Sequence, residues 1–232
     1  AIDLAIEYLE FERIYFAIFA DRRGRLYCMG TTITYQTDQK IKSLITFANS
    51  EPLNEVGKYW LYVHASNTWG NDKVSYGERY KFTEDKLDEF ISYADAPLDN
   101  KGWNFADKPM EFLNTCMHLK RLKKEGLGYP CNLPVSMDAT CSGLQVLSIL
   151  MRDENTARKV NVLPSTEPQD IYSAVAEKVK AEVELKAQEG SREANRWLQF
   201  GITRKIVKRN IMTYVYSLKP YGARQQIFDE YK

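Results

Sequence analysis

The sequence has 232 residues, of which 44% are hydrophobic and 27% charged, and its formal net charge is +1. A chain of this length can bury a substantial core, and its near-neutral charge gives no global sign of a nucleic-acid partner. Two histidines argue against a Ser–His or Cys–His hydrolase, and four cysteines without a CxxC pair argue against a zinc site. We expect Cys28, Cys116, Cys131 and Cys141 to be reduced and mostly buried. No apolar run reaches the ~20 residues that a bilayer requires, so no membrane partner is expected.

The first half of the chain predicts helices with a few short strands. Apolar spacing over residues 1–20 favours a helix that runs into a strand, and Asp21–Tyr27 (DRRGRLY) reads as a turn that opens the next strand. Helical patterns follow an apolar, strand-like run. In order, these segments are a strand at Ser43–Phe47 and helices at Pro52–His64, Tyr76–Tyr93 and Pro109–Lys124.

The second half begins after a break at Gly126–Pro130. An apolar strand is predicted at Cys131–Met137, and it ends at Asp138. Helices are then expected at Leu144–Met151, Gln169–Lys186, Arg196–Phe200 and Ile202–Thr213. Because helices outnumber strands, we predict an α+β, helix-rich fold.

One local charge asymmetry stands out in the nearly neutral chain. Residues 194–224 contain seven basic residues and no acidic one. This stretch is a candidate surface for phosphates. The alternative is a solvated helix face whose acidic partners lie elsewhere in the fold, and composition alone does not separate the two.

Two constellations could carry chemistry. Asp138 follows an apolar strand and precedes small residues (ATCSG), so its carboxylate could hold a divalent metal, or it could merely cap the next helix. On a helix, Arg204 and Lys208 lie about 40° apart, and Tyr216 lies about 80° further on if the helix continues. That side could clamp a phosphate and donate a proton, or it could be an ordinary solvated face.

Together these segments resemble motifs A and B of the single-subunit DNA-directed RNA polymerases of bacteriophages and mitochondria. The pattern D-x-x-x-S-G begins at Asp138, and R-x3-K-x7-Y begins at Arg204. Further segments resemble the family in its own order, so the resemblance covers roughly residues 20–228. They are DRRGRLY, WLYVHASN, NDKVSYGERYKF, MRDE, VNVLPSTEPQDIY and YGARQQ. The resemblance implies part of a right-hand polymerase fold, with a partial palm and the fingers.

The resemblance also implies a catalytic centre. Asp138 would be one of two aspartates that hold two Mg²⁺ ions about 4 Å apart, with the backbone carbonyl of Ala139 as a further ligand. Lys208 would be the catalytic lysine, which binds the triphosphate and serves as a general acid. Arg204 would also grip the triphosphate of the ribonucleotide. The family usually has glycine at the position of Ala139, a departure that a carbonyl ligand tolerates.

Further contacts follow from the same resemblance. Lys73 would reach the triphosphate from the fingers side, and Tyr172 would lie near the incoming nucleotide. Arg23 and Arg25 would contact the template and the new RNA strand. Tyr216 would end the fingers helix, complete the catalytic set and recognise the ribose.

Two small residues refine this picture. Ser217 stands where the family has glycine, so a positive φ at that position would cost on the order of 1 kcal/mol. Related DNA polymerases place a glutamate, which blocks a 2′-hydroxyl, five residues after the motif A aspartate. Gly143 occupies that position here, which favours ribonucleotides, although Gly143 could also be a simple turn residue.

The resemblance predicts a palm portion at residues 1–160 with helical insertions and a fingers portion at residues 161–232. No HD dipeptide of motif C occurs, and no counterpart of the thumb or the N-terminal promoter-reading region is seen. The second metal-binding aspartate must therefore come from elsewhere. The chain could be a fragment or the ordered part of a longer polypeptide, one subunit of a split polymerase with a complementing chain, or a degenerate relative.

The predicted function is DNA-templated RNA synthesis by nucleotidyl transfer from ribonucleoside triphosphates, by a two-metal mechanism. Its partners would be a DNA template with a promoter and the nascent RNA. The alternatives are a non-catalytic nucleic-acid-binding subunit and a relative of DNA polymerases or primases. A virus-encoded protein in the cytoplasm of an infected host cell is favoured, and the mitochondrial matrix is the alternative location.

Overall fold

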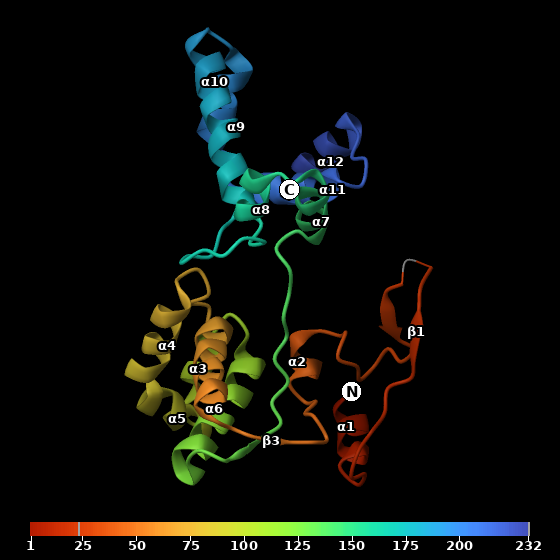
Figure 1. The fold of residues 1–232 in the computed structure, drawn as a ribbon, viewed down its shortest axis with the longest axis vertical. Coiled ribbons are helices and arrows are strands. Elements are labelled where there is room, and N and C mark those ends of the chain that lie inside the picture. Colours follow the sequence, from red (N-terminus) through yellow and green to blue (C-terminus); the bar gives the residue numbers. More distant parts are fainter. Residues whose placement is uncertain (23, 232) are drawn as a thin grey trace. The chain divides into compact units, whose positions relative to one another are not determined.

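A computed structural model describes residues 1–22 and 24–231, so the predicted template contact Arg23 lies outside the described residues. The chain divides into two compact units, Ala1–Ser136 and Met137–Lys232 (Figure 1). Both units are mainly helical, and the strands are short. The predicted helix-rich α+β composition is confirmed. The assignment of residues 1–160 to a palm and 161–232 to fingers stays a prediction.

The first unit opens with helix α1 (Ile2–Tyr8) and a hairpin of two antiparallel strands. Strand β1 (Ile18–Ala20) pairs with β2 (Leu26–Cys28), with Phe19 opposite Tyr27. The turn closes through the Asp21 amide, which donates to the Arg25 carbonyl at 2.8 Å, and Gly24 takes a φ of +77°. Because a left-handed φ strains other residues, glycine suits this turn. The predicted turn and strand at Asp21–Tyr27 are confirmed.

The rest of the first unit is a group of helices with clear start and stop signals. Its elements are α2 (Gln39–Lys42), β3 (Glu51–Pro52), α3 (Glu55–Trp69), α4 (Tyr76–Asp85), α5 (Leu87–Asp95), the 3-10 helix η1 (Lys101–Phe105), α6 (Pro109–Glu125) and β4 (Pro130–Cys131). Asn54 caps α3 at its start, and a capping box formed by Ser75 and Glu78 opens α4. The three helices predicted in this region are confirmed, the second of them as the pair α4 and α5.

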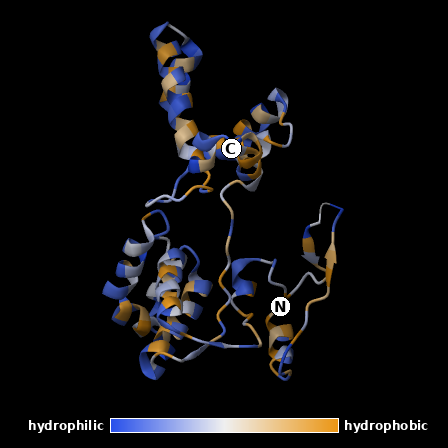
Figure 2. Cartoon of the chain, in the orientation of Figure 1, coloured by the Kyte–Doolittle hydropathy of each residue, from blue (hydrophilic) through white to orange (hydrophobic). Residues whose placement is uncertain are grey.

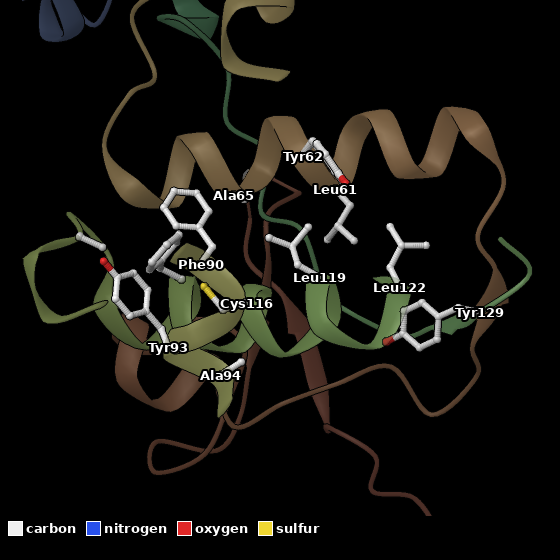
Figure 3. Close-up of a cluster of buried hydrophobic side chains, with 12 residues drawn as sticks. Leu61, Tyr62, Ala65, Phe90, Tyr93, Ala94, Cys116, Leu119, Leu122 and Tyr129 are labelled. Atoms are coloured by element: carbon white, nitrogen blue, oxygen red, sulfur yellow. The ribbon is translucent and has the colours of Figure 1, made fainter. Parts of the chain in front are cut away.

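The core of this unit lies between α3, α5 and α6. Phe90 of α5 and Phe112 of α6 are fully buried, and their rings meet edge to face with centroids 4.8 Å apart. Figure 3 shows the side chains of Leu61 on α3 and Leu119 on α6 pointing into the same cluster. The buried members are Leu61, Tyr62, Ala65, Phe90, Tyr93, Ala94, Ala106, Phe112, Cys116, Leu119, Leu122 and Tyr129.

Two predicted strands are wrong. Residues 43–47 form no strand, and of the predicted strand at Cys131–Met137 only Cys131 is in one, where β4 pairs antiparallel with β3. A strand needs a partner for its backbone groups. Here the Phe47 amide bonds to the Asn132 carbonyl at 3.0 Å, and that contact does not extend into a ladder among the described residues. Asp138 therefore does not follow a strand.

The second unit is built from helices alone among its described residues. They are α7 (Ser142–Met151), α8 (Glu154–Lys159), α9 (Ile171–Gln188), α10 (Arg192–Phe200), α11 (Arg204–Tyr214) and α12 (Pro220–Glu230). Helix α9 packs against α10 and α11, and α11 packs against α12. The four helices predicted after residue 143 are confirmed, while α8 and α12 had not been predicted.

The buried cluster of the second unit is small. It consists of Cys141, Val160, Ile171 and Tyr172, with Leu144, Val162, Val175 and Ile211 packed partly against it. Helix α7 is largely hydrophobic (Figure 2), yet Val146, Ile149 and Leu150 remain more than half exposed. This unit therefore buries much less apolar surface than its sequence offers.

The four cysteines are free thiols, and Cys116 and Cys141 are buried while Cys28 and Cys131 are half-buried. This outcome matches the prediction of reduced cysteines. In the part of the chain that the structure describes, no helix is both long and apolar enough to cross a membrane.

Candidate functional site

Three of the predicted site residues meet at the start of α11. Arg204 is the first residue of that helix, and Lys208 follows one turn later. The Arg204 guanidinium lies over the Tyr172 ring, 5.0 Å from its centroid, and the Lys208 Nζ lies 5.9 Å from the same centroid. Tyr172, on the first turn of α9, is only 5% exposed, so its ring forms a fixed support for both cations. Two cations on one aromatic ring form a surface suited to an anion.

Asp170 joins this cluster, although sequence reasoning did not single it out. It caps the start of α9, where its Oδ1 accepts the Tyr172 amide at 3.0 Å. Its Oδ2 accepts the Ser173 hydroxyl at 2.8 Å and the Arg204 Nε–H at 2.5 Å. Burial raises the pKa of Asp170, but the hydrogen bonds from Arg204 and Ser173 outweigh it, so the pKa lies below its ordinary value. Asp170 is therefore ionised at neutral pH.

Tyr172 also connects the cluster to the segment that follows Asp138. Burial, and then the neighbouring Cys141, raise the pKa of Tyr172 to about 12. The phenol therefore stays protonated at neutral pH and cannot act as a base. Cys141 packs with Tyr172 in the buried cluster, three residues after Asp138. The segment after Asp138 and the start of α11 thus meet at Tyr172.

A second contact joins that segment to the other end of α11. Gly143 is the second residue of α7, so the alternative that it is a turn residue is wrong. A Cβ at Gly143 would lie 2.4 Å from the Val215 Cγ2 and 3.4 Å from the Tyr216 hydroxyl. No side chain fits there without movement of Val215.

The end of α11 differs from the expected geometry. The helix stops at Tyr214, so Tyr216 does not continue its face, and the Tyr216 side chain is exposed. Ser217 takes a φ of +63°, the left-handed conformation that its place in the family pattern suggested. A short turn then leads to α12, which begins at Pro220.

Asp138 lies in the second unit and is exposed. Its Oδ1 accepts the amide of Ala139 at 2.9 Å, a local bond that caps no helix; the N-cap of α7 is Cys141. Among the described residues, no three His, Cys, Asp or Glu side chains gather closely enough to hold a metal ion. One exposed carboxylate fits a part of a Mg²⁺ site, since Mg²⁺ takes only one or two carboxylates and fills its other positions with water and phosphate. It does not provide for two ions.

The remaining predicted residues lie in the first unit. Lys73 is in the loop between α3 and α4, where its Nζ is 2.6 Å from Asp72. Arg25 lies in the β1–β2 turn, and its amide donates to the Asp21 Oδ1 at 3.0 Å. The α11 cluster belongs to the second unit, and the roles of Lys73 and Arg25 remain predictions.

The basic stretch at residues 194–224 is partly neutralised by acidic residues of α12, as the interpretation as a solvated helix face predicts. Lys205 lies 3.1 Å from Glu230, and Arg209 lies 3.6 Å from Asp229, both on α12. Of the four basic residues on α11, only Lys208 has no carboxylate within ion-pair distance among residues 1–22 and 24–231. The solvated-face interpretation thus explains Lys205 and Arg209 and leaves Lys208 unexplained.

The site therefore has the make-up of an anion-binding surface, with an arginine and an unpaired lysine one turn apart on a tyrosine ring. A family model described as DNA-dependent RNA polymerase matches residues 51–232, and the chain belongs to that family.

Curated relatives come from phages and mitochondria. T7 RNA polymerase of Escherichia phage T7 is 34% identical over 99% of this chain and 28% of its own length. The mitochondrial DNA-directed RNA polymerase of Schizosaccharomyces pombe is 36% identical over 94% of this chain and 19% of its own length. The corresponding human protein is 37% identical over 89% of this chain and 17% of its own length. The chain thus spans less than a third of the length of these relatives, and its resemblance to the single-subunit polymerases is confirmed.

Proposed function

We propose that this chain supplies part of the palm and fingers of a DNA-directed RNA polymerase, which joins ribonucleotides to an RNA 3′ end on a DNA template. The observation that carries the proposal is Lys208, an unpaired cation beside Arg204 on the Tyr172 ring. Its relatives are DNA-directed RNA polymerases. A triphosphate is the anion that such an enzyme must bind, and an arginine with a lysine matches its charge.

In this proposal the α11 residues act on the triphosphate. Arg204 binds phosphate oxygens through its planar fork, and Lys208 neutralises the charge that develops on the departing pyrophosphate or donates a proton to it. Tyr172 holds both cations in place and sits next to the nucleotide. Lys73 adds a further phosphate contact.

Asp138 and the Ala139 carbonyl would hold Mg²⁺, which when bound activates the attacking hydroxyl and stabilises the leaving oxygen. Because Asp138 is a single carboxylate, a two-ion centre needs a second aspartate from another segment. A longer polypeptide or a complementing chain would supply it.

Ribose recognition is assigned to the contact between α7 and the end of α11. Gly143 carries no side chain that could block a 2′-hydroxyl; Val215 packs against it, and the Tyr216 hydroxyl lies 3.4 Å from the position that a Cβ at residue 143 would take. That hydroxyl is an available hydrogen-bond partner for a 2′-hydroxyl. Arg23 and Arg25 would contact the template and the RNA. The cytoplasm of a phage-infected cell is the proposed location, with the mitochondrial matrix as the alternative.

The test is RNA extension from a primer on a DNA template, with the other segments of a single-subunit polymerase supplied. Asp138→Asn should lower the extension rate on the order of 10²-fold or more, because the amide is a poor ligand for Mg²⁺. Asp153→Asn, which alters an aspartate that caps α8 in the same unit, is the matched control and should leave the rate nearly unchanged.

Extension by Asp138→Asn at the wild-type rate would remove Asp138 from the metal site. Salt-dependent binding of a template–RNA hybrid without any extension would instead favour a non-catalytic nucleic-acid-binding subunit.

A further inference from the structure

The carboxylate of Asp170 caps helix α9 with one oxygen and binds Arg204 with the other. A cap needs one acceptor, which Oδ1 provides to the Tyr172 amide. The other oxygen, Oδ2, accepts the Arg204 Nε–H at 2.5 Å from a residue 34 positions further along the chain. The ion pair therefore ties the start of α9 to the start of α11.

Asp153 provides an internal comparison. It caps α8 in the same way: its Oδ1 accepts the Thr156 amide at 3.2 Å, and its Oδ2 accepts the Thr156 hydroxyl at 2.5 Å. No arginine contacts Asp153 among the described residues. A capping aspartate in this fold is thus complete without a cation, and the arginine contact at Asp170 is an addition.

The geometry of Arg204 shows what that addition achieves. Asp170 engages the Nε–H, on the edge that Nε shares with one Nη nitrogen, while the Tyr172 ring lies against the face of the guanidinium at 5.0 Å. The four N–H groups on Nη1 and Nη2 make no hydrogen bond or ion pair within the described part of the chain. With one edge held and one face supported, the remaining edge presents two parallel donors, the geometry that binds phosphate oxygens.

We propose that Asp170 is a positioning residue, which holds Arg204 by its Nε edge so that the Nη edge faces the triphosphate of the incoming nucleotide. The inference rests on the proposed function, since it assigns the partner of Arg204. It adds a residue that acts through another and does not itself touch the substrate.

A competing account makes the opposite prediction. Asp170 is negatively charged, so it could repel a phosphate or compete with it for Arg204. In that case its neutralisation would tighten anion binding. Under the positioning account, neutralisation frees the arginine to sample many orientations, and anion binding weakens.

The substitution Asp170→Asn separates these accounts. Asparagine caps a helix about as well as aspartate, so the start of α9 is retained. Its single carbonyl oxygen is occupied by the cap, and its amide group then faces the Arg204 Nε–H, donor against donor. Asp153→Asn changes the same kind of cap without an arginine and is the matched control.

The 232-residue chain would be titrated with inorganic triphosphate, and the Arg204 Nε–H would be followed by ¹⁵N NMR after assignment with Arg204→Lys. In the wild-type chain this signal should persist as triphosphate binds. In Asp170→Asn it should broaden or disappear, and the Kd for triphosphate should rise roughly fivefold to tenfold. Asp153→Asn should match the wild type in both respects, and all three chains should melt within a few degrees of one another.

Equal or tighter triphosphate binding by Asp170→Asn would overturn the positioning role, and so would loss of the Nε–H signal when triphosphate binds the wild type. A wild-type chain in which neither Arg204 nor Lys208 responds to triphosphate would overturn the proposed function, and the role of Asp170 with it. The two failures are therefore distinguishable.

Discussion

The two units of the chain are stabilised in different ways. In the first unit, twelve buried residues form one cluster, and every described residue with a left-handed backbone is a glycine. In the second unit the buried cluster has four residues, and four non-glycine residues have positive φ: Cys141, Arg152, Asn161 and Ser217. Such conformations cost energy and gather at functional sites. Cys141 and Ser217 flank the candidate site, so the unit with the smaller core also carries the strained backbone.

The largest expected effect tests the deep core of the first unit. Phe112 is 0% exposed, so Phe112→Ala should lower the free energy of unfolding by about 3–5 kcal/mol. Denaturant titration followed by tryptophan fluorescence measures this, because Trp60, Trp69 and Trp103 lie in the first unit and only Trp197 lies in the second. A Trp197→Phe background isolates the signal of the first unit.

The matched control for that substitution is Phe105→Ala. Phe105 is 85% exposed, so its loss should change the unfolding free energy by less than about 0.5 kcal/mol. Similar losses at both phenylalanines would mean that burial does not set the stability of this unit.

A smaller effect should appear with pH. Burial, and then the charges of Lys108 and His118, lower the pKa of His64 to about 4 in the folded chain, against an ordinary value of 6.5. The neutral imidazole favours the folded state, so its contribution is complete above pH 6.5 and is lost as pH falls from 6.5 through 4. Between pH 7.5 and 5 His64 alone should account for a loss of about 2 kcal/mol in the free energy of unfolding, measured by denaturant titration at each pH as the difference between the wild type and His64→Gln.

Two comparisons sharpen that measurement. His64→Gln should reduce the pH dependence of the unfolding free energy but not abolish it. His118 still contributes, because burial and then the charge of Arg121 lower its pKa to about 4 as well. The second unit contains no histidine, so the Trp197 signal should report little change over the same pH range. An equal loss in both units would show that the histidines are not responsible.

The smallest expected effect concerns the backbone of the second unit. Ser217→Gly should raise its stability by about 0.5–1 kcal/mol, because glycine adopts the φ of +63° without strain. Ser191→Gly is the control of opposite sign: Ser191 has a φ of −66° and caps α10, so its loss should destabilise. Thermal unfolding followed through Trp197 measures both. Destabilisation by Ser217→Gly would mean that the serine side chain contributes more than its strained φ costs.

Helices were predicted more accurately than strands, because the residues that start and end a helix lie next to it in the sequence. Helix α6 was expected at Pro109–Lys124 and spans Pro109–Glu125, since proline in its first turn and Gly126 at its end mark both limits. The predicted strands at residues 43–47 and 131–137 depended on partners that the sequence pattern does not specify. An apolar run alone cannot supply the missing ladder.

In the candidate site too, residues in recognisable motifs were predicted, and contacts between distant segments were not. Arg204, Lys208 and Tyr172 were found through family motifs and do meet in space. Asp170 was missed because an aspartate before a helix is an ordinary cap signal, and its contact with Arg204 spans two helices. The contact between Gly143 and Val215 was missed as well, since no pattern links a glycine in one helix to a valine just beyond another.

That last contact limits how the protein can evolve. Any side chain at residue 143 meets Val215 before it meets a substrate, since the first added carbon would lie 2.4 Å from the valine methyl group. A change at Gly143 must therefore be accompanied by a smaller residue at position 215. Under the proposed role of Gly143 in ribose recognition, a change of substrate preference through residue 143 alone would pass through an intermediate that packs badly.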